Sequence, residues 1–131
     1  MPTQIGNLIL AANAGIMLFF SVAVAPTIFK VLPQEWAAKY VRAFFPKYYA
    51  VLGVSTAISA VLADTVGFRL ALAGCAFFFF FSQLWITPTV NRARDTGRVR
   101  TFKLLHTLSV VINMLQLAIF LFILYSRIAL S

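Results

Sequence analysis

Four stretches of this chain are apolar over the length that a membrane-spanning helix needs. They cover residues 5–29, 48–66, 70–90 and 104–126. About 20 mostly apolar residues are required to cross a hydrocarbon core about 30 Å thick. Because lipid cannot hydrogen-bond to the backbone, each stretch is expected to be helical over its whole length. The sequence therefore predicts an all-α integral membrane four-helix bundle, with residues 1–131 forming a single four-pass domain.

The composition agrees with a membrane protein and argues against a soluble domain. Hydrophobic residues make up 62% of the chain and charged residues 11%, whereas soluble domains carry roughly 45–50% apolar and about 25% charged residues. The first stretch resembles a signal peptide in its small residues Ala23 and Ala25. No basic residue precedes it, however, and Pro26 would directly follow the cut, so we expect a retained helix.

Basic residues are concentrated in two of the three connections. The formal net charge is +8, which on a soluble domain would suggest a nucleic-acid partner. In a membrane protein, lysine and arginine in short loops instead mark the cytoplasmic side. The first connection holds Lys30, Lys39, Arg42 and Lys47, and the third holds Arg92, Arg94, Arg98, Arg100 and Lys103. We therefore expect both basic loops in the cytoplasm, both termini outside, a bacterial inner membrane as the location, and no nucleic-acid partner.

The expected partners are the bilayer and its anionic headgroups, which attract basic side chains near the surface. Six side chains are predicted to make headgroup contacts: Lys39, Arg42, Arg92, Arg98, Arg100 and Lys103. A larger membrane complex and a homo-oligomer both stay open as further partners.

The first connection, "PQEWAAKYVRAFF", has a helical pattern of its own. Its apolar face holds Trp36, Ala37, Tyr40, Val41, Phe44 and Phe45, and the opposite face holds Glu35, Lys39 and Arg42. Pro33 suits a first helical turn and Pro46 is expected to end the helix. This pattern predicts a short amphipathic cytoplasmic helix between spans 1 and 2, which either lies in the membrane interface or packs under the bundle.

The second connection, "ADTVGFR", is expected to be a tight turn. Gly67 would allow the chain to reverse, and Asp64 could pair with Arg69.

Polar residues recur at helical spacing inside the apolar stretches. The fourth stretch carries His106, Ser109, Asn113 and Gln116, the third carries Gln83, Thr87 and Asn91, and the first carries Asn13 and Ser21. Because lipid cannot satisfy these groups, they should face the bundle interior or a partner chain. Two interpretations stay open: hydrogen bonds that fix helix packing, each worth about 0.6–2 kcal/mol, or a polar cavity for a ligand.

The inventory of reactive residues is small. The one histidine, His106, could hydrogen-bond, carry protons or bind haem. A second histidine ligand is absent from the sequence, which leaves Met17 or Met114 as conceivable axial partners. The one cysteine, Cys75, sits in an apolar run. We therefore expect no metal site and no resident cofactor, with haem as the alternative.

No catalytic residues are predicted. The three acidic residues fall in separate elements, which argues against a paired-carboxylate mechanism. There is also no glycine-rich phosphate loop and no nucleophile elbow.

Three clusters carry a family resemblance. The first is Ala25, Pro26, Phe29 and Leu32 followed by Phe45, Pro46, Tyr48 and Tyr49; the second is Trp85, Pro88, Asn91, Arg94 and Asp95; the third is Phe102, His106, Ser109 and Asn113. In this order they resemble the transmembrane-protein-205-like family of small membrane proteins, domain of unknown function 4149. The resemblance implies a four-pass helical domain without an agreed activity. Its layout is similar to copper-resistance-type and haem-dependent protoporphyrinogen oxidase domains.

The motif residues coincide with the polar positions that helical spacing picks out. We therefore expect one cytoplasmic-side polar site built from Asn91, Arg94, Asp95, His106, Ser109 and Asn113. The sequence predicts a membrane protein without evident catalytic activity, either an accessory or interaction subunit or a small-molecule-handling module. The alternative is a haem- or quinone-linked redox protein in which His106 is the ligand or proton-transfer residue. Transport would require oligomers, because four helices leave little room for a lumen.

Overall fold

Four long helices make up nearly all of the chain. The structure, a computed structural model, describes residues 1–129 and has no strand among them. The four helical spans are Pro2–Val31, Gln34–Leu62, Val66–Asp95 and Val99–Ala129, each long and apolar enough to cross a membrane. The predicted all-α four-span architecture is thus confirmed. Helical hydrogen bonding continues beyond the apolar stretches into polar residues, except at the end of the second span, which stops at Leu62 instead of residue 66.

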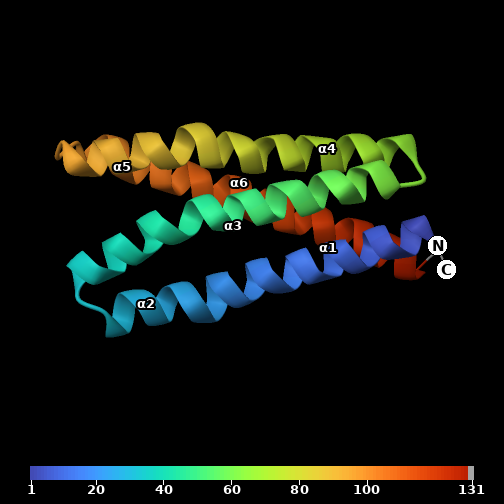
Figure 1. Cartoon of the computed structure of the whole chain (residues 1–131), viewed down its shortest axis with the longest axis horizontal. Helices are drawn as coiled ribbons and strands as arrows, with labels where there is room; N and C mark the ends of the chain where they lie inside the picture. The colour runs from blue at the N-terminus through green and yellow to red at the C-terminus, as the bar shows by residue number, and fades with distance from the viewer. Residues whose placement is uncertain (130–131) are drawn as a thin grey trace.

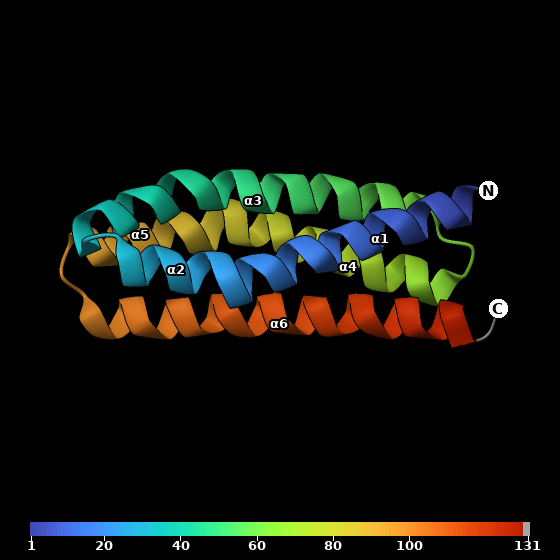
Figure 2. The ribbon, with the colours of Figure 1, turned by 90° about the horizontal axis from the view of Figure 1, so that it is seen from below.

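The four spans run side by side and turn at two ends (Figures 1 and 2). At one end lie the connections at residues 32–33 and 96–98, and we call this the basic end. The opposite end holds Met1, the last described residue Ala129 and the connection at residues 63–65, and we call it the terminal end. Gly97 turns the chain at the basic end with φ +73°, a left-handed conformation that favours glycine after a helix.

The first and third spans each contain a π-helical turn. Span 1 consists of α1 (Pro2–Phe19), the π turn η1 (Phe20–Val24) and α2 (Ala25–Val31). Span 3 consists of α4 (Val66–Phe81), the π turn η2 (Ser82–Ile86) and α5 (Thr87–Asp95). Proline lacks an N–H and its ring crowds the carbonyl four residues earlier. For Pro26 and Pro88 that carbonyl belongs to Val22 and Leu84, inside the π turns, where the wider turn accommodates the missing bond.

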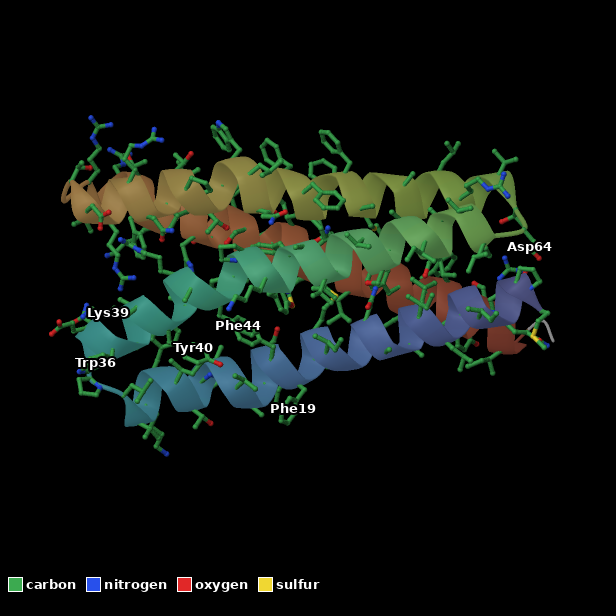
Figure 3. The ribbon with its side chains drawn as sticks, in the orientation of Figure 1. Phe19, Trp36, Lys39, Tyr40, Phe44 and Asp64 are labelled. Carbon is green, nitrogen blue, oxygen red and sulfur yellow. The ribbon has the colours of Figure 1, made fainter. Side chains whose placement is uncertain are left out.

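The second span is one uninterrupted helix, α3 (Gln34–Leu62), and Pro46 lies inside it. The expectation of a separate short amphipathic helix that ends at Pro46 is therefore wrong. A single missing N–H is tolerated in a spanning helix whose neighbours support it. The amphipathic pattern belongs instead to the first turns of α3, where Ala37 and Val41 are buried while Trp36 and Tyr40 are exposed (Figure 3).

The turn at the terminal end differs from the sequence-based prediction. Only residues 63–65 lie outside helices, and Gly67 is already part of α4. The Thr65 side chain caps α4 by accepting a hydrogen bond from the Phe68 N–H. Asp64 pairs with Arg127 of α6 (Val99–Ala129) rather than with Arg69. Arg69 instead donates to the Ala63 carbonyl at 2.7 Å.

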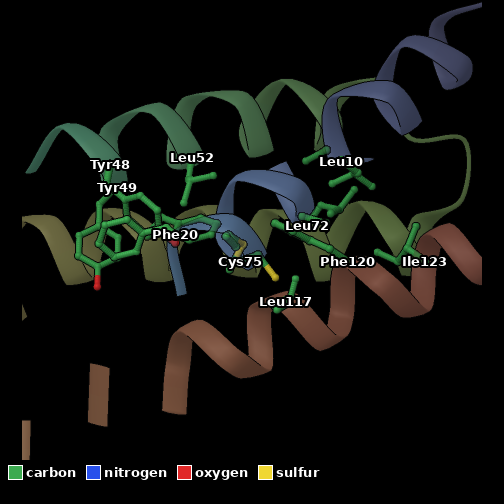
Figure 4. Packing of buried hydrophobic residues seen from close by; sticks show 14 of the residues in the cluster. Leu10, Phe20, Tyr48, Tyr49, Leu52, Leu72, Cys75, Leu117, Phe120 and Ile123 are labelled. Carbon is green, nitrogen blue, oxygen red and sulfur yellow. The ribbon is translucent and has the colours of Figure 1, made fainter. Parts of the chain in front are cut away.

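The core lies where α1, α3, α4 and α6 meet, and it extends from the terminal end to Phe20, Tyr48 and Tyr49 near the middle of the bundle (Figure 4). Its most buried large side chains include Leu10, Met17, Leu52, Phe79 and Phe120. Polar side chains inside this core hydrogen-bond between spans. Asn13 donates to Thr56 at 3.2 Å, Ser59 donates to the Gly6 carbonyl at 3.2 Å, and Gln116 donates to the Cys75 carbonyl at 2.9 Å.

Candidate functional site

A cavity of about 620 Å³ lies within the half of the bundle that faces the basic end. Side chains from all four spans line it. They are Phe20, Ser21, Ala25, Phe29, Val41, Phe45, Tyr48, Tyr49, Ile86, Thr87, Val90, Asn91, Arg94, Phe102, His106, Ser109, Val110, Asn113 and Met114. Five of the six residues predicted to form a polar site are in this set, and Asp95 is not. The structure therefore brings these five residues to one cavity, and their role as a binding site stays a prediction.

That polar wall is built by α5 and α6, which pack against each other. Thr87, Asn91 and Arg94 recur at helical spacing on span 3, and His106, Ser109 and Asn113 do so on α6. Arg94 comes one residue before the end of α5, so the charged residue lies nearest the basic end. The polar groups therefore run from the basic end toward the middle of the bundle.

Three side chains at the basic end of the cavity form a stack. The guanidinium carbon of Arg94 lies 5.4 Å from the centre of the Phe102 ring, a cation–π contact. The His106 ring is parallel to that of Phe102, with centroids 6.0 Å apart and an interplanar angle of 8°. The Phe102 ring thus contacts both Arg94 and His106 and brings them to the same part of the cavity.

Farther from the basic end, the polar wall meets the aromatic wall through one hydrogen bond. The Tyr48 hydroxyl donates to the Asn113 side-chain oxygen at 3.4 Å. Ser109 donates to the His106 carbonyl at 2.7 Å, within its own helix. Gln116, the last member of the predicted stripe on α6, is buried in the core and does not line the cavity.

The aromatic wall depends on the π turn in span 1. Phe20, the first residue of that turn, is buried and stacks on Phe44 with centroids 4.9 Å apart. It also contacts Phe45 at 5.6 Å and Tyr48 at 5.1 Å. Figure 4 shows Phe20, Tyr48 and Tyr49 gathered at one end of the core. The second π turn contributes Ile86 to the same cavity. Both π turns therefore lie against the cavity.

Asp95 lies outside the cavity because Arg42 holds it. The Arg42 guanidinium donates to both carboxylate oxygens, Nη1 to Oδ2 at 3.2 Å and Nη2 to Oδ1 at 2.7 Å. This pair connects α3 with the end of α5. The sequence predicted Asp95 in the polar site and Arg42 at the lipid headgroups. It could not predict their pairing, because the two residues lie on different helices, α3 and α5.

The other basic residues at this end lie on the surface. Lys39 pairs with Glu35 at 3.4 Å and lies over the Trp36 ring at 4.6 Å. Arg92 and Arg98 line a small separate hollow of about 110 Å³. Arg100 and Lys103 are exposed. Of the residues predicted to contact lipid headgroups, Arg42 is already paired with Asp95. The exposed positions of the others are compatible with headgroup contact, which stays a prediction.

The reactive residues of the chain are dispersed. Within residues 1–129 no three side chains of histidine, cysteine, aspartate or glutamate come together. Cys75 is buried in the core, and so is Met17, which is 0% exposed and does not line the cavity. Met114 lines the cavity, but it projects from the same helix as His106, two turns away.

Sequence reasoning missed the aromatic half of the site. Tyr48, Tyr49 and Phe45 belong to the "FPKYY" cluster, whose repeated aromatic residues were a usable signal. Phe20 was missed because phenylalanine is abundant in every span, although it continues the buried stripe of Asn13 and Met17 on span 1 at helical spacing.

The fold and the cavity together define a class: a small four-pass helical membrane protein with a mixed polar and aromatic cavity near one end. The chain belongs to the family described as Domain of unknown function (DUF4149), whose family model matches residues 8–99. This match covers the first three spans and leaves the α6 wall of the cavity outside it. No curated protein and no solved structure matches the chain. The likeness to transmembrane-protein-205-like proteins in particular stays a prediction.

Proposed function

We propose that this protein is a non-enzymatic membrane protein that binds a small molecule in the cavity between α6 and the other spans. Of the two functions that the sequence suggested, ligand handling is favoured over a purely structural accessory role by one observation. The cavity of about 620 Å³ brings Arg94, Asn91 and His106 together on one wall. Ligand sites of about 300–1,000 Å³ with mostly apolar walls and a few convergent polar groups are typical of small-molecule binding.

The contacts of the charged groups support a binding role over a catalytic one. All three acidic side chains are held in ion pairs outside the cavity: Glu35 with Lys39, Asp64 with Arg127, and Asp95 with Arg42. Among residues 1–129 the lining therefore offers hydrogen-bond donors and one permanent cation but no carboxylate, so His106 has no carboxylate partner there for acid–base catalysis.

The test is to fill the cavity and look for loss of a co-purifying molecule. Ser109→Trp places an indole in the cavity, while Val111→Trp places the same indole on the exposed face of the same helix. Native mass spectrometry of gently purified protein should show a bound small molecule on the wild type and on Val111→Trp. The Ser109→Trp variant should lack it. A molecule retained by Ser109→Trp, or none enriched over bulk lipid on the wild type, contradicts the proposal.

A redox role for His106 is the second candidate, and the observation that favours it is the placement of the imidazole in the cavity wall. A haem iron bound by His106 would need its second axial ligand from another helix or from a small molecule, because Met114 projects from the same helix as His106. An optical spectrum of the same preparation separates the two functions. A Soret band that disappears in His106→Ala supports haem binding, and a spectrum without one supports a ligand of another kind.

We further propose that the basic end faces the cytoplasm, since it carries nine of the 11 lysines and arginines. In a bacterial inner membrane the cavity would then open near the inner leaflet.

A further inference from the structure

The charge inside the cavity is unbalanced. Among residues 1–129, Arg94 is the only lining residue that is always charged, and the lining holds no aspartate or glutamate. Its sequence neighbour Asp95 lies outside the cavity, interacts electrostatically with Arg94, and accepts hydrogen bonds from Arg42 on both oxygens. Within the same described residues, Arg94 has a cation–π contact with Phe102 and no carboxylate within ion-pair distance. A half-buried guanidinium without a carboxylate in contact favours an anion that can accept its paired N–H donors.

Donors flank Arg94 on the same wall. Asn91 is one helical turn before it on α5, and His106 stacks with the Phe102 ring that Arg94 also contacts. An anionic group at Arg94 would therefore have amide and imidazole N–H groups within the same part of the cavity.

Most of the rest of the cavity is apolar. Beyond the stack, aromatic and aliphatic side chains from all four spans make up most of the lining, and Ser21, Thr87, Ser109 and Asn113 are polar exceptions. On α6 the lining runs from Phe102 to Met114, a rise of about 18 Å at the helical repeat. A water-soluble anion would leave the apolar side chains along this length facing water, whereas a hydrocarbon chain would cover them.

The cavity also opens toward lipid on one side. Among residues 1–129, the backbone of α6 lies close to those of α1, α4 and α5 but not to those of α2 and α3, which line the cavity across from it; the Tyr48–Asn113 hydrogen bond links α3 to α6 across this space. On that side Phe29 of α2 is 56% exposed and Val110 of α6 is 45% exposed. In a bilayer these two residues would border the hydrocarbon core. A chain from the adjacent leaflet can therefore enter between α2 and α6 without crossing a polar surface.

Resting on the proposed ligand-binding function, we infer that the cavity binds an anionic amphiphile, a phosphate or carboxylate group attached to a hydrocarbon chain. The anionic head pairs with Arg94 near the basic end. The chain extends along Phe45 and Met114 and reaches the bilayer past Phe29. Hydrocarbon gains little by moving from lipid into such a cavity, so the head group provides the selectivity.

The experiment compares matched probes on the full chain in a non-ionic detergent, with native mass spectrometry as the readout. Dodecyl phosphate carries both head and chain, dodecanol lacks the charge, inorganic phosphate lacks the chain, and dioleoyl phosphatidic acid is a two-chain bilayer lipid. The variants are Arg94→Gln and Arg92→Gln, which remove the same charge from the same helix inside and outside the cavity. Arg94→Lys keeps the charge and shows whether loss of binding in Arg94→Gln reflects misfolding.

We expect dodecyl phosphate to bind the wild type and Arg92→Gln about ten-fold or more tightly than dodecanol, the effect of one charge-assisted pair. In Arg94→Gln the two should bind alike, and Arg94→Lys should retain part of the preference. If phosphatidic acid binds as tightly as dodecyl phosphate, the ligand is a two-chain bilayer lipid. If it binds more weakly, the ligand is a single-chain amphiphile.

Two results overturn the inference and leave the proposed function standing. One is equal binding of dodecyl phosphate and dodecanol to the wild type, and the other is inorganic phosphate binding as tightly as dodecyl phosphate. If neither amphiphile binds and Ser109→Trp is indistinguishable from the wild type, the proposed ligand-binding function fails as well.

Discussion

Arg42 and Asp95 lie 53 residues apart in the sequence and form a two-point ion pair across the basic end of the bundle. At the terminal end, Arg127 and Asp64 make a second two-point pair, between α6 and the α3–α4 connection. Each pair joins elements that are distant in the chain, at an end of the bundle where water and headgroups are present. The two ends are therefore held by ionic contacts and the middle by packing.

A double-mutant cycle tests the pair at the basic end. Arg42→Gln and Asp95→Asn should each lower the melting temperature slightly, since both side chains are about half exposed, 42% and 57%. The double variant should be no less stable than either single variant, because each change removes the same contact. Circular dichroism melts in detergent measure this. Arg42→Gln combined with Asp64→Asn, at opposite ends of the bundle, is the control and should be additive. Additive losses for the Arg42–Asp95 cycle would show that the pair contributes nothing.

The pair at the terminal end predicts a pH dependence of stability. Hydrogen bonding by the Arg127 guanidinium holds the pKa of the Asp64 carboxyl below its ordinary value. A carboxyl whose pKa is lowered on folding stabilises the protein above its unfolded-state pKa, about 3.9, and loses that contribution as pH falls through the folded-state pKa. The melting temperature of the wild type should therefore fall more steeply than that of Asp64→Asn below about pH 4. Parallel curves would contradict this.

Asn13 is expected to hold α1 against α3. Its side-chain nitrogen donates to the Thr56 hydroxyl at 3.2 Å, and its oxygen accepts from Ser55 at 3.0 Å. Asn13→Leu removes both bonds and should cost about 1–2 kcal/mol, near the upper range for polar contacts between membrane helices. Asn7→Leu is the control on the same helix, because Asn7 has no such contacts. Reversible unfolding in mixed micelles measures the difference, and equal stability of the two variants would show that the Asn13 bonds are dispensable.

Gly53 of α3 packs against the Phe80 ring of α4. A Cβ added there would lie 2.9 Å from the tip of the Phe80 ring, so the ring would have to move. Gly53→Ala should therefore cost about 1 kcal/mol, the low end for overpacking, since a ring tip can shift. Gly74→Ala on α4 meets nothing within 4 Å and should be neutral or stabilising by helix propensity. Melting temperatures of the two variants decide this, and an unchanged value for Gly53→Ala would falsify the close packing.

The sequence predicted features that depend on local periodicity. Four apolar stretches predicted the spans, and spacing within each helix placed Asn91 with Arg94 on one face of α5 and His106 with Ser109 on one face of α6. Residues on one helical face are neighbours whatever the topology is, whereas the meeting of the two faces at one cavity follows from the packing of α5 against α6.

Pairings between distant elements could not be predicted in the same way. Asp64 was assigned to Arg69, five residues away, but pairs with Arg127, because only the assembled bundle brings the end of α6 to that turn. Local helix propensity predicts that a helix ends at Pro46. In the bundle α3 continues through Pro46, because the neighbouring spans pack against it and stabilise it.

The orientation of the bundle is the last prediction, and it rests on the positive-inside rule. Single cysteines at Gln34 near the basic end and at Gln4 near the terminal end report the two sides, because both side chains are exposed. Cys75→Ala removes the native thiol, which is buried. In intact bacterial cells an impermeant maleimide should label Gln4→Cys directly and Gln34→Cys only after permeabilisation. The reverse pattern would place the basic end outside, and the cavity would then receive its ligand from the outer leaflet.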